Sequence, residues 1–118
     1  MFRYFESPDG MDVLVGRSDV DNDTLTFKVA DALDFWMHVS GGSGAHVVIR
    51  NPDRLDRLPR DTLRFAARLA VRYSKAKHGK KVSVGVALRK DVEKIRGVPA
   101  GKVVLKRHKK VKVDSDLE

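Results

Sequence analysis

The chain has 118 residues, a length typical of one domain, and its 34% of charged side chains give a formal net charge of +8 at pH 7. It contains no cysteine, which excludes disulfide bonds, thiol nucleophiles and cysteine-ligated zinc. Because the N-terminus has no apolar signal segment and no stretch approaches the ~18 apolar residues of a membrane span, we expect a cytoplasmic protein that does not enter a membrane.

The first 30 residues predict a β-hairpin that is followed by a short helix. Residues 2–5 and 11–15 have the composition of strands, and the turn sequence SPDG lies between them. Further along, the polar side chains of residues 21–23 offer N-cap oxygens, and an apolar pair four residues apart follows them. We therefore expect a helix from about Asn22 to Ala30.

The segment from Asp34 to Arg50, DFWMHVSGGSGAHVVIR, predicts two strands that are joined by a glycine-rich turn from Ser40 to Gly44. Side chains alternate between the two faces of a strand, so one face of this pair should lie in the core. That face carries Phe35, Met37, Val39, Val47 and Ile49. The opposite face carries an indole and two imidazoles, and we expect an exposed surface beside the turn that groups Trp36, His38 and His46.

The second half of the chain begins with a predicted long helix. It starts at Arg60 or Asp61 and runs to His78, where Gly79 serves as its C-cap. At 100° per residue, one side of this helix is apolar and packs on the sheet, while a narrow stripe on the other side presents cations. The stripe consists of Arg64, Arg68, Arg72 and Lys75.

The remaining residues predict further strands and complete the fold. Residues 82–88 alternate as one strand, and the segment after them indicates two or three short strands, interrupted by Gly97, Pro99 and Gly101. We therefore expect an α+β fold in which one short and one long helix pack on a mixed or antiparallel sheet. Residues 1–113 should form a single domain, and residues 114–118 an acidic, frayed C-terminus.

The positive charge is concentrated in the second half of the chain. Residues 1–60 hold 7 Lys and Arg against 10 Asp and Glu, whereas residues 61–118 hold 17 against 6. Such a field attracts polyanions, because Lys and Arg displace the counterions of phosphates. Charge alone does not choose between RNA, DNA and an acidic protein surface, so a DNA-binding protein and an adaptor with a basic helix remain alternatives to RNA binding.

The sequence supports catalysis or metal binding at the turn region less well than it supports binding of a polyanion. Asp34, His38 and His46 could form a set of two imidazoles and one carboxylate, but their spacing matches no helix-borne metal motif. Ser43 lacks the surroundings of a nucleophile elbow, and no Lys-Ser or Lys-Thr pair follows the glycines as in a P-loop. We expect no enzyme, no metal and no cofactor, and a hydrolase with a histidine-bound metal is the least favoured alternative.

The glycines and the tryptophan each allow two interpretations. Gly41, Gly42 and Gly44 permit close approach of a ligand to the backbone, but an ordinary hairpin loop has the same composition. A lone tryptophan is commonly a core residue, yet the neighbours of Trp36 already occupy the buried face. That arrangement leaves its ring available for stacking on single-stranded bases.

Spaced residues along nearly the whole chain resemble those of a known family. They are Gly16-Arg17, Asn22-Asp23 with Leu25, Thr26 and Lys28, then Asp34-x-Trp36-x-His38, Gly44-x-His46-Val47-Val48-Ile49, Ala66-Ala67, Ala70, Tyr73-Ser74 and Gly101-Lys102-Val103. This pattern is similar to that of the NFACT-R domain, an RNA-binding module of ribosome-associated quality-control factors. Ser43 and Ala45 depart from it, because the family commonly has Pro and Ser there.

The resemblance implies a stand-alone module that binds tRNA or ribosomal RNA, with the large ribosomal subunit as a further partner. It does not imply tail synthesis, and it does not define an oligomeric state. We expect Trp36, His38 and His46 to contact bases or sugars, and Asn22 and Asp23 to cap the short helix and hold Arg17. The residues expected to attract phosphates are Arg17, Lys28, Arg50, Arg64, Arg68, Arg72, Lys75, Lys77, Lys80 and Lys81.

Overall fold

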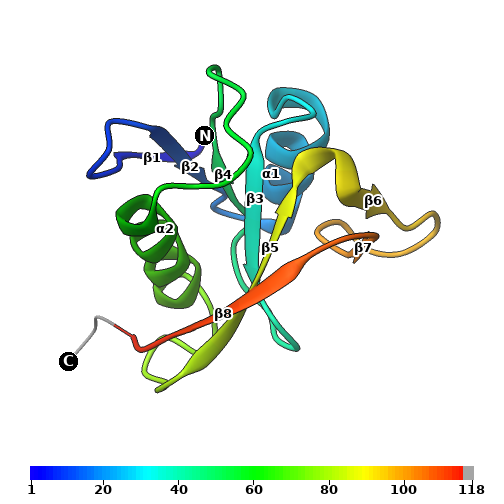
Figure 1. Ribbon diagram of the computed structural model, residues 1–118. Coiled ribbons are helices and arrows are strands. Elements are labelled where there is room, and N and C mark those ends of the chain that lie inside the picture. The colour runs from blue at the N-terminus through cyan, green and yellow to red at the C-terminus, as the bar shows by residue number, and fades with distance from the viewer. Residues whose placement is uncertain (116–118) are drawn as a thin grey trace.

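Alternating apolar side chains give the protein a central sheet of six antiparallel strands (Figure 1). The structure is a computed structural model, and it describes residues 1–115. The predicted strands are present, and the antiparallel form of the predicted sheet is confirmed. In spatial order the strands are β1 (Arg3–Glu6), β2 (Asp12–Val15), β4 (Val47–Ile49), β3 (Phe35–Val39), β5 (Val82–Leu88) and β8 (Lys109–Val113).

The long helix α2 (Arg60–Arg72) covers one face of this sheet (Figure 1). Ala66 and Ala70 are fully buried, and their small side chains let the helix backbone approach the strands closely. The predicted core face of the central strand pair packs here and is confirmed, because every one of its side chains is buried: Phe35, Met37, Val39, Val47 and Ile49.

The other face of the sheet is covered by two short units from distant parts of the chain. One consists of helix α1 (Asp19–Thr24) and the π-helix η1 (Leu25–Val29), and the other is the hairpin of β6 (Val92–Lys94) and β7 (Val103–Leu105). Figure 1 shows α1, β6 and β7 across the sheet from α2. A 3-10 turn, η2 (Arg89–Asp91), links β5 to β6.

A second apolar cluster fills the space beneath this cover. It consists of Leu25, Trp36, Val48, Ala87 and Val92. The prediction of an exposed surface at the indole and the imidazoles is therefore wrong: the Trp36 and His46 side chains are each 1% exposed, and His38 is partly buried. Trp36 and Val48 are opposite each other in register, and together they form an apolar area that folding removes from water.

The short helix differs from the prediction at its start and in its form. It begins at Asp19, three residues before the predicted start, because the Ser18 hydroxyl accepts a hydrogen bond from the Asp21 N–H at 3.0 Å. Its second half widens into a π-helix, in which the Ala30 N–H donates to the Leu25 carbonyl at 2.9 Å. Leu25 and Thr26 are both fully buried there, although they are adjacent in the sequence.

The long helix starts at Arg60 as predicted but ends at Arg72, so its predicted end at His78 is wrong. Ser74 leaves the helix to form a β-bridge with Gly44, and two backbone hydrogen bonds hold this pairing. The Ala45 N–H donates to the Tyr73 carbonyl at 2.9 Å, and the Lys75 N–H donates to the Ser43 carbonyl at 3.1 Å. Lys75, Lys77 and His78 therefore lie in turns beyond the helix, and Gly79 is not its C-cap.

The end of the described chain is attached to the turn before β5. Asp114 accepts a hydrogen bond from the Lys81 N–H at 2.6 Å, and the Ser115 N–H donates to the Gly79 carbonyl at 3.0 Å. The remainder of the predicted frayed C-terminus, residues 116–118, lies outside the described residues. Within residues 1–115, no helix combines the length and the apolar character that a membrane span requires.

The bridge between Gly44 and Ser74 yields a stability prediction. A Cβ atom at Gly44 would lie 2.7 Å from the Ser74 Cβ, whereas one at Gly42 would meet nothing closer than the Val39 Cγ2 at 4.0 Å. We expect Gly44→Ala to lower the free energy of unfolding by roughly 1–3 kcal/mol, because the packed chain must shift. Gly42→Ala is the control and should change it by less than about 0.5 kcal/mol. Urea denaturation measures both, and equal effects would contradict the close approach.

Candidate functional site

The structure brings the three predicted rings together on the second face of the sheet. The Trp36 and His46 ring centroids are 5.1 Å apart with an edge-to-face orientation, and His38 lies 5.5 Å from His46. His38 also stacks beside Trp36 at 6.0 Å. The grouping follows from strand parity, since Trp36 and His38 share one face of β3 and His46 directly precedes β4.

A chain of hydrogen bonds accounts for the buried polar atoms of this group. The Trp36 indole N–H donates to the Thr26 Oγ1 at 3.1 Å, and the Thr26 hydroxyl lies 2.8 Å from the His46 Nδ1. The other imidazole nitrogen, Nε2, lies 3.1 Å from the Gly101 carbonyl. Because a carbonyl only accepts, Nε2 carries the proton, and Nδ1 accepts from Thr26. The neutral imidazole thus has both of its nitrogens satisfied.

Burial shifts both imidazoles toward the neutral form. Loss of solvent lowers the pKa of His46 to about 4, and the neighbouring His38 adds to this effect. Protonation of Nδ1 would also set a second donor against the Thr26 hydroxyl. Burial likewise lowers the pKa of His38, an effect that nearby backbone hydrogen-bonding groups oppose and Lys102 reinforces. Two neutral rings therefore stand beside the glycine turn at neutral pH.

Asp23 attaches the loop between β6 and β7 to the short helix. Its carboxylate accepts from the Gly101 N–H at 2.8 Å and forms an ion pair with the Lys94 Nζ at 2.5 Å. Burial acts to raise the pKa of Asp23, but the hydrogen bonds from Lys94 and Gly101 outweigh it and hold that pKa below its ordinary value. Gly101 is therefore held on both sides, by Asp23 at its N–H and by His46 at its carbonyl.

Asn22 has a structural role, but not the predicted one of capping the helix. Its Oδ1 accepts from the His46 N–H at 3.0 Å, and its Nδ2 donates to the Gly44 carbonyl at 3.4 Å. The side chain is buried, and it fits only because residue 16 is glycine: a Cβ atom at Gly16 would lie 2.0 Å from the Asn22 Oδ1. Asp21, rather than Asn22 or Asp23, accepts the Arg17 N–H, at 3.3 Å.

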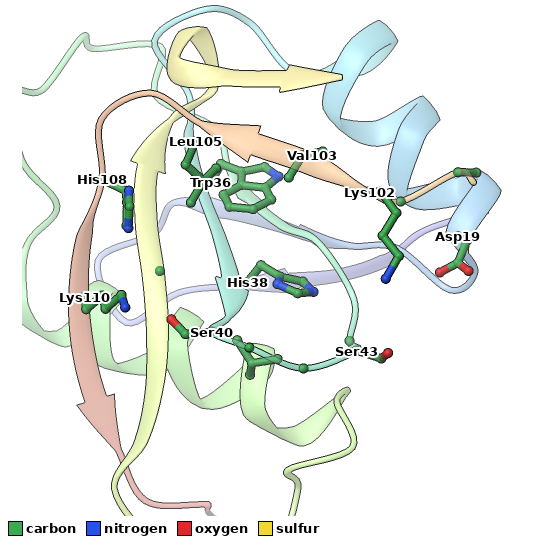
Figure 2. Close-up of a pocket in the computed structure, with 17 residues that line it drawn as sticks. Asp19, Trp36, His38, Ser40, Ser43, Lys102, Val103, Leu105, His108 and Lys110 are labelled. Atoms are coloured by element: carbon green, nitrogen blue, oxygen red, sulfur yellow. The ribbon is translucent and has the colours of Figure 1, made fainter. Parts of the chain in front are cut away.

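One cavity, which we call the His38 pocket, lies between the glycine turn and the hairpin of β6 and β7 (Figure 2). Its volume is ≈ 600 Å³. Figure 2 shows the His38 ring in this space, with Lys102 directed toward it and with Val103 and Leu105 beside Trp36. His108 and Lys110 line it from the side of β8.

A second cavity, which we call the basic groove, lies on the other side of the glycine turn. Its volume is ≈ 410 Å³, and Ser43, Gly44 and Asp19 line both cavities. Its cations come from four places: β1, the residue before the cap of α1, the end of α2 and the turns beyond it. They are Arg3, Arg17, Arg72, Lys75 and Lys77. The early end of α2 thus carries Lys75 and Lys77 to the turn.

The other predicted phosphate-attracting residues have varied positions. Arg64 and Arg68 line a neighbouring hollow together with Arg72, so the predicted cationic stripe leads toward the basic groove. Arg50 lies at the opposite end of the strand pair, where its guanidinium pairs with Asp31 at 3.1 Å and Asp34 at 2.9 Å. The remaining three, Lys28, Lys80 and Lys81, are exposed and line neither cavity.

Sequence reasoning missed several residues that line the two cavities. They are Arg3, Asp19, Lys102, His108 and Lys110. Strand parity could have found Lys110, because the alternation in KKVKV places it on the face opposite to Val111. Nothing in the local pattern indicates that Lys102 faces His38, since that position depends on how the β6–β7 hairpin folds back.

The three residues of the metal-binding alternative do not form a common site. The Asp34 carboxylate accepts from the Asn51 N–H at 2.8 Å and pairs with Arg50, at the end of β3 far from the turn. Residues 1–115 contain no group of three or more His, Asp or Glu side chains that could hold a metal ion.

Comparison with known proteins places these features in a family. The chain matches the family model of the NFACT protein RNA binding domain over residues 1–107. It is 37% identical over 112 residues to the Rqc2 homolog RqcH of Streptococcus suis (strain 05ZYH33), and the aligned region covers 94% of this chain and 20% of the relative. It is 34% identical over 116 residues to the Rqc2 homolog RqcH of Bacillus subtilis (strain 168), and the aligned region covers 97% of this chain and 19% of the relative.

The similarity extends to a solved structure. The C-terminal part of the fibronectin/fibrinogen-binding protein from Streptococcus suis matches with a TM-score of 0.87 and 33% identity. This match covers 97% of the present chain and 45% of that chain. The chain spans about a fifth of the length of the curated relatives that it matches.

The buried His46 predicts a loss of stability in acid. The unfolded chain has the ordinary histidine pKa of 6.5, whereas the folded value is about 4, so the folded state binds fewer protons between these values. The free energy of unfolding should have its full value above pH 6.5, and it should fall by up to about 3 kcal/mol as the pH drops to 4. Urea denaturation at pH 7 and at about pH 4.5 measures it.

The variant His46→Gln provides the comparison, because the fall in stability over this pH range should be much smaller without the imidazole. If the variant does not fold, NMR titration of the wild-type imidazole replaces it, and His46 should remain neutral until about pH 4. A His46 that protonates near pH 6.5 in the folded protein would contradict this account.

Proposed function

Because the chain belongs to the family of NFACT RNA-binding domains, as its sequence predicts, we propose that it binds RNA across the glycine turn of residues 40–44. The observation that supports this most directly is the basic groove, which gathers cations from four separate places beside that turn. A surface assembled in this way is well suited to a phosphate backbone.

Three cations of the groove, Arg17, Lys75 and Lys77, are exposed. Among residues 1–115, the ion pairs of other basic residues involve Arg50, Lys94 and Lys106, whereas no such pair forms at Arg17, Lys75 or Lys77. Exposed cations without a carboxylate partner exchange only water and mobile ions when a phosphate arrives. We therefore assign the phosphate contacts to this groove and to the stripe of Arg64 and Arg68 that leads to it.

The glycine turn lets a strand of RNA cross from the groove to the His38 pocket. Gly41 adopts a positive φ of 70°, and no atom would meet a Cβ there within 4 Å, so the tip of the turn is open. Residues 40–43 are exposed, and their backbone groups lie close to the surface. A ligand can therefore approach the main chain without obstruction by side chains.

Of the three rings, only His38 remains a candidate for direct contact with RNA. Trp36 and His46 are buried and hydrogen-bonded, so we assign them to support of the site instead of base stacking. Their predicted contacts with bases are thus replaced by an indirect role, in which they hold the turn and the Gly101 loop. We propose a binding module without catalytic activity.

We further propose that the ligand is tRNA or ribosomal RNA and that the protein acts on the ribosome in quality control. The support is the similarity to the Rqc2 homologs, which the chain matches over about a fifth of their length. Sedimentation of a cell lysate through a sucrose gradient tests this proposal. The protein should travel with ribosomal subunits at low salt and leave them at high salt, and its absence from those fractions at low salt would contradict it.

The groove also yields a quantitative prediction. The double variant Lys75→Gln, Lys77→Gln should weaken binding to single-stranded RNA and reduce the slope of log K against log salt by about 1.4, because each lost phosphate contact contributes about 0.7. Fluorescence anisotropy over a range of salt concentrations measures this slope.

The matched control is Lys28→Gln, Lys90→Gln, which removes the same charge at exposed positions that line neither cavity. We expect its salt slope to equal that of the wild type. Equal slopes for the two double variants would mean that net charge, and not the groove, governs binding. The same titration with DNA and with an acidic protein distinguishes the alternatives, and equal affinity for all three would argue against an RNA ligand.

A further inference from the structure

The His38 pocket includes a gap above Gly85, the middle residue of a row that crosses three strands. Residues that are opposite each other in an antiparallel sheet project from the same face, and here His38 pairs with Gly85 and Gly85 pairs with Lys110. Because Gly85 has no side chain, β5 places no side chain between the imidazole and the lysine, and the Leu105 side chain lies over this position. The backbones at His38 and Lys110 are two strand spacings, ~10 Å, apart.

The sides of this gap differ in character. A Cβ atom at Gly85 would lie 3.5 Å from the His38 carbonyl oxygen and 3.6 Å from the Leu105 Cδ1, so an apolar side chain overhangs the floor. Val103 extends that apolar wall, while Lys102, directly before β7, and Lys110, in β8, bring positive charge to the pocket (Figure 2). Asp19 is the one carboxylate among the lining residues in the described part of the chain.

The main chain contributes much of the remaining lining. Five of the nine glycines of the sequence line this pocket, so parts of its wall are main chain without side-chain cover. The exposed main-chain groups are those of Gly41 and Gly42 in the turn, since the polar groups of Gly101 and the Gly44 carbonyl already have partners. An imidazole, an apolar wall, exposed main-chain groups and two cations suit a flat heterocycle that carries phosphate. The volume of ≈ 600 Å³ falls in the range of small-ligand sites, about 300–1,000 Å³.

We propose that the His38 pocket takes the base of one unpaired RNA nucleotide, between His38 and Leu105, with Lys102 and Lys110 binding the phosphates on its two sides. The inference rests on the proposed function and adds the form of the ligand to it. A base that is paired and stacked inside a duplex cannot insert between His38 and Leu105, so the nucleotide must be unstacked. The basic groove then holds the phosphates that follow across the turn.

Filling the floor of the pocket tests the proposal. An added Cβ atom at Gly85 would make ordinary van der Waals contacts, and a β-branched residue suits a strand. We therefore expect Gly85→Val to fold, with its methyl groups placed in the gap. We expect it to weaken binding to a short single-stranded RNA by about tenfold, within the range for loss of one base contact. Binding to a blunt RNA duplex should not change.

The matched control is Ser83→Val, which adds a similar side chain to the same face of β5 but outside the pocket lining. It should bind both RNAs as the wild type does. If Gly85→Val is folded by circular dichroism and also binds single-stranded RNA with wild-type affinity, the pocket proposal is wrong and the proposed function stands. If the wild type binds neither RNA, the proposed function itself fails.

A titration of the wild type tests the same proposal without the Gly85→Val variant, in case that variant does not fold. Adenosine and uridine monophosphates should shift the amide NMR signals of Gly85, Gly101 and Lys102, whereas inorganic phosphate should leave the Gly85 signal unchanged. Identical shifts from phosphate and from both nucleotides would show that the base does not enter, and would overturn the proposal.

Discussion

The buried hydrogen-bond chain from Trp36 through Thr26 and His46 to Gly101 is the interaction on which the rest of the site depends. It joins a strand, a π-helix, the start of a second strand and a distant loop, and each of its polar atoms loses water on folding. Such a network stabilises the fold only when every member has a partner, and in the neutral state of His46 every member has one. Burial of His46 within this network lowers the pKa of the imidazole to about 4, with the neighbouring His38 adding to the effect. The network also ties the position of the Gly101 loop to the position of the glycine turn.

The turn has two anchors, one on each side of the sheet. Asn22 holds the Gly44 carbonyl and the His46 N–H from the helix side, and Ser74 pairs with Gly44 from the end of α2. Both contacts need a missing side chain, at Gly16 in the first case and at Gly44 in the second. The base of the turn is therefore fixed, while its tip at Gly41 remains open. Because the two cavities share Ser43 and Gly44, a strand that crosses this tip can enter both.

What the basic side chains can bind depends on whether they form ion pairs as well as on how many there are. The cations that lie among carboxylates, such as Arg50 between Asp31 and Asp34 and Lys94 on Asp23, connect elements of the fold. Lys75 and Lys77, beside the glycine turn, come from a stretch, residues 62–90, that contains no acidic residue. The net charge of +8 is thus less informative than the position of the cations outside such pairs, and a phosphate ligand acts on the latter.

The sequence by itself determined the strands, their faces, the start of the long helix and the grouping of Trp36, His38 and His46, because these follow from a two-residue or 3.6-residue period within one segment. The pattern of motifs also identified the family. Tertiary structure decided that the second face of the sheet is covered as well, because residues 92–105 are distant in the sequence from β3 and no local period records their contact with it. It likewise ended α2 at Arg72, since pairing of Ser74 with Gly44 outweighs the local helical pattern. For the same reason the burial of Trp36 and the approach of Lys102 to His38 arise only when the β6–β7 hairpin folds over the sheet.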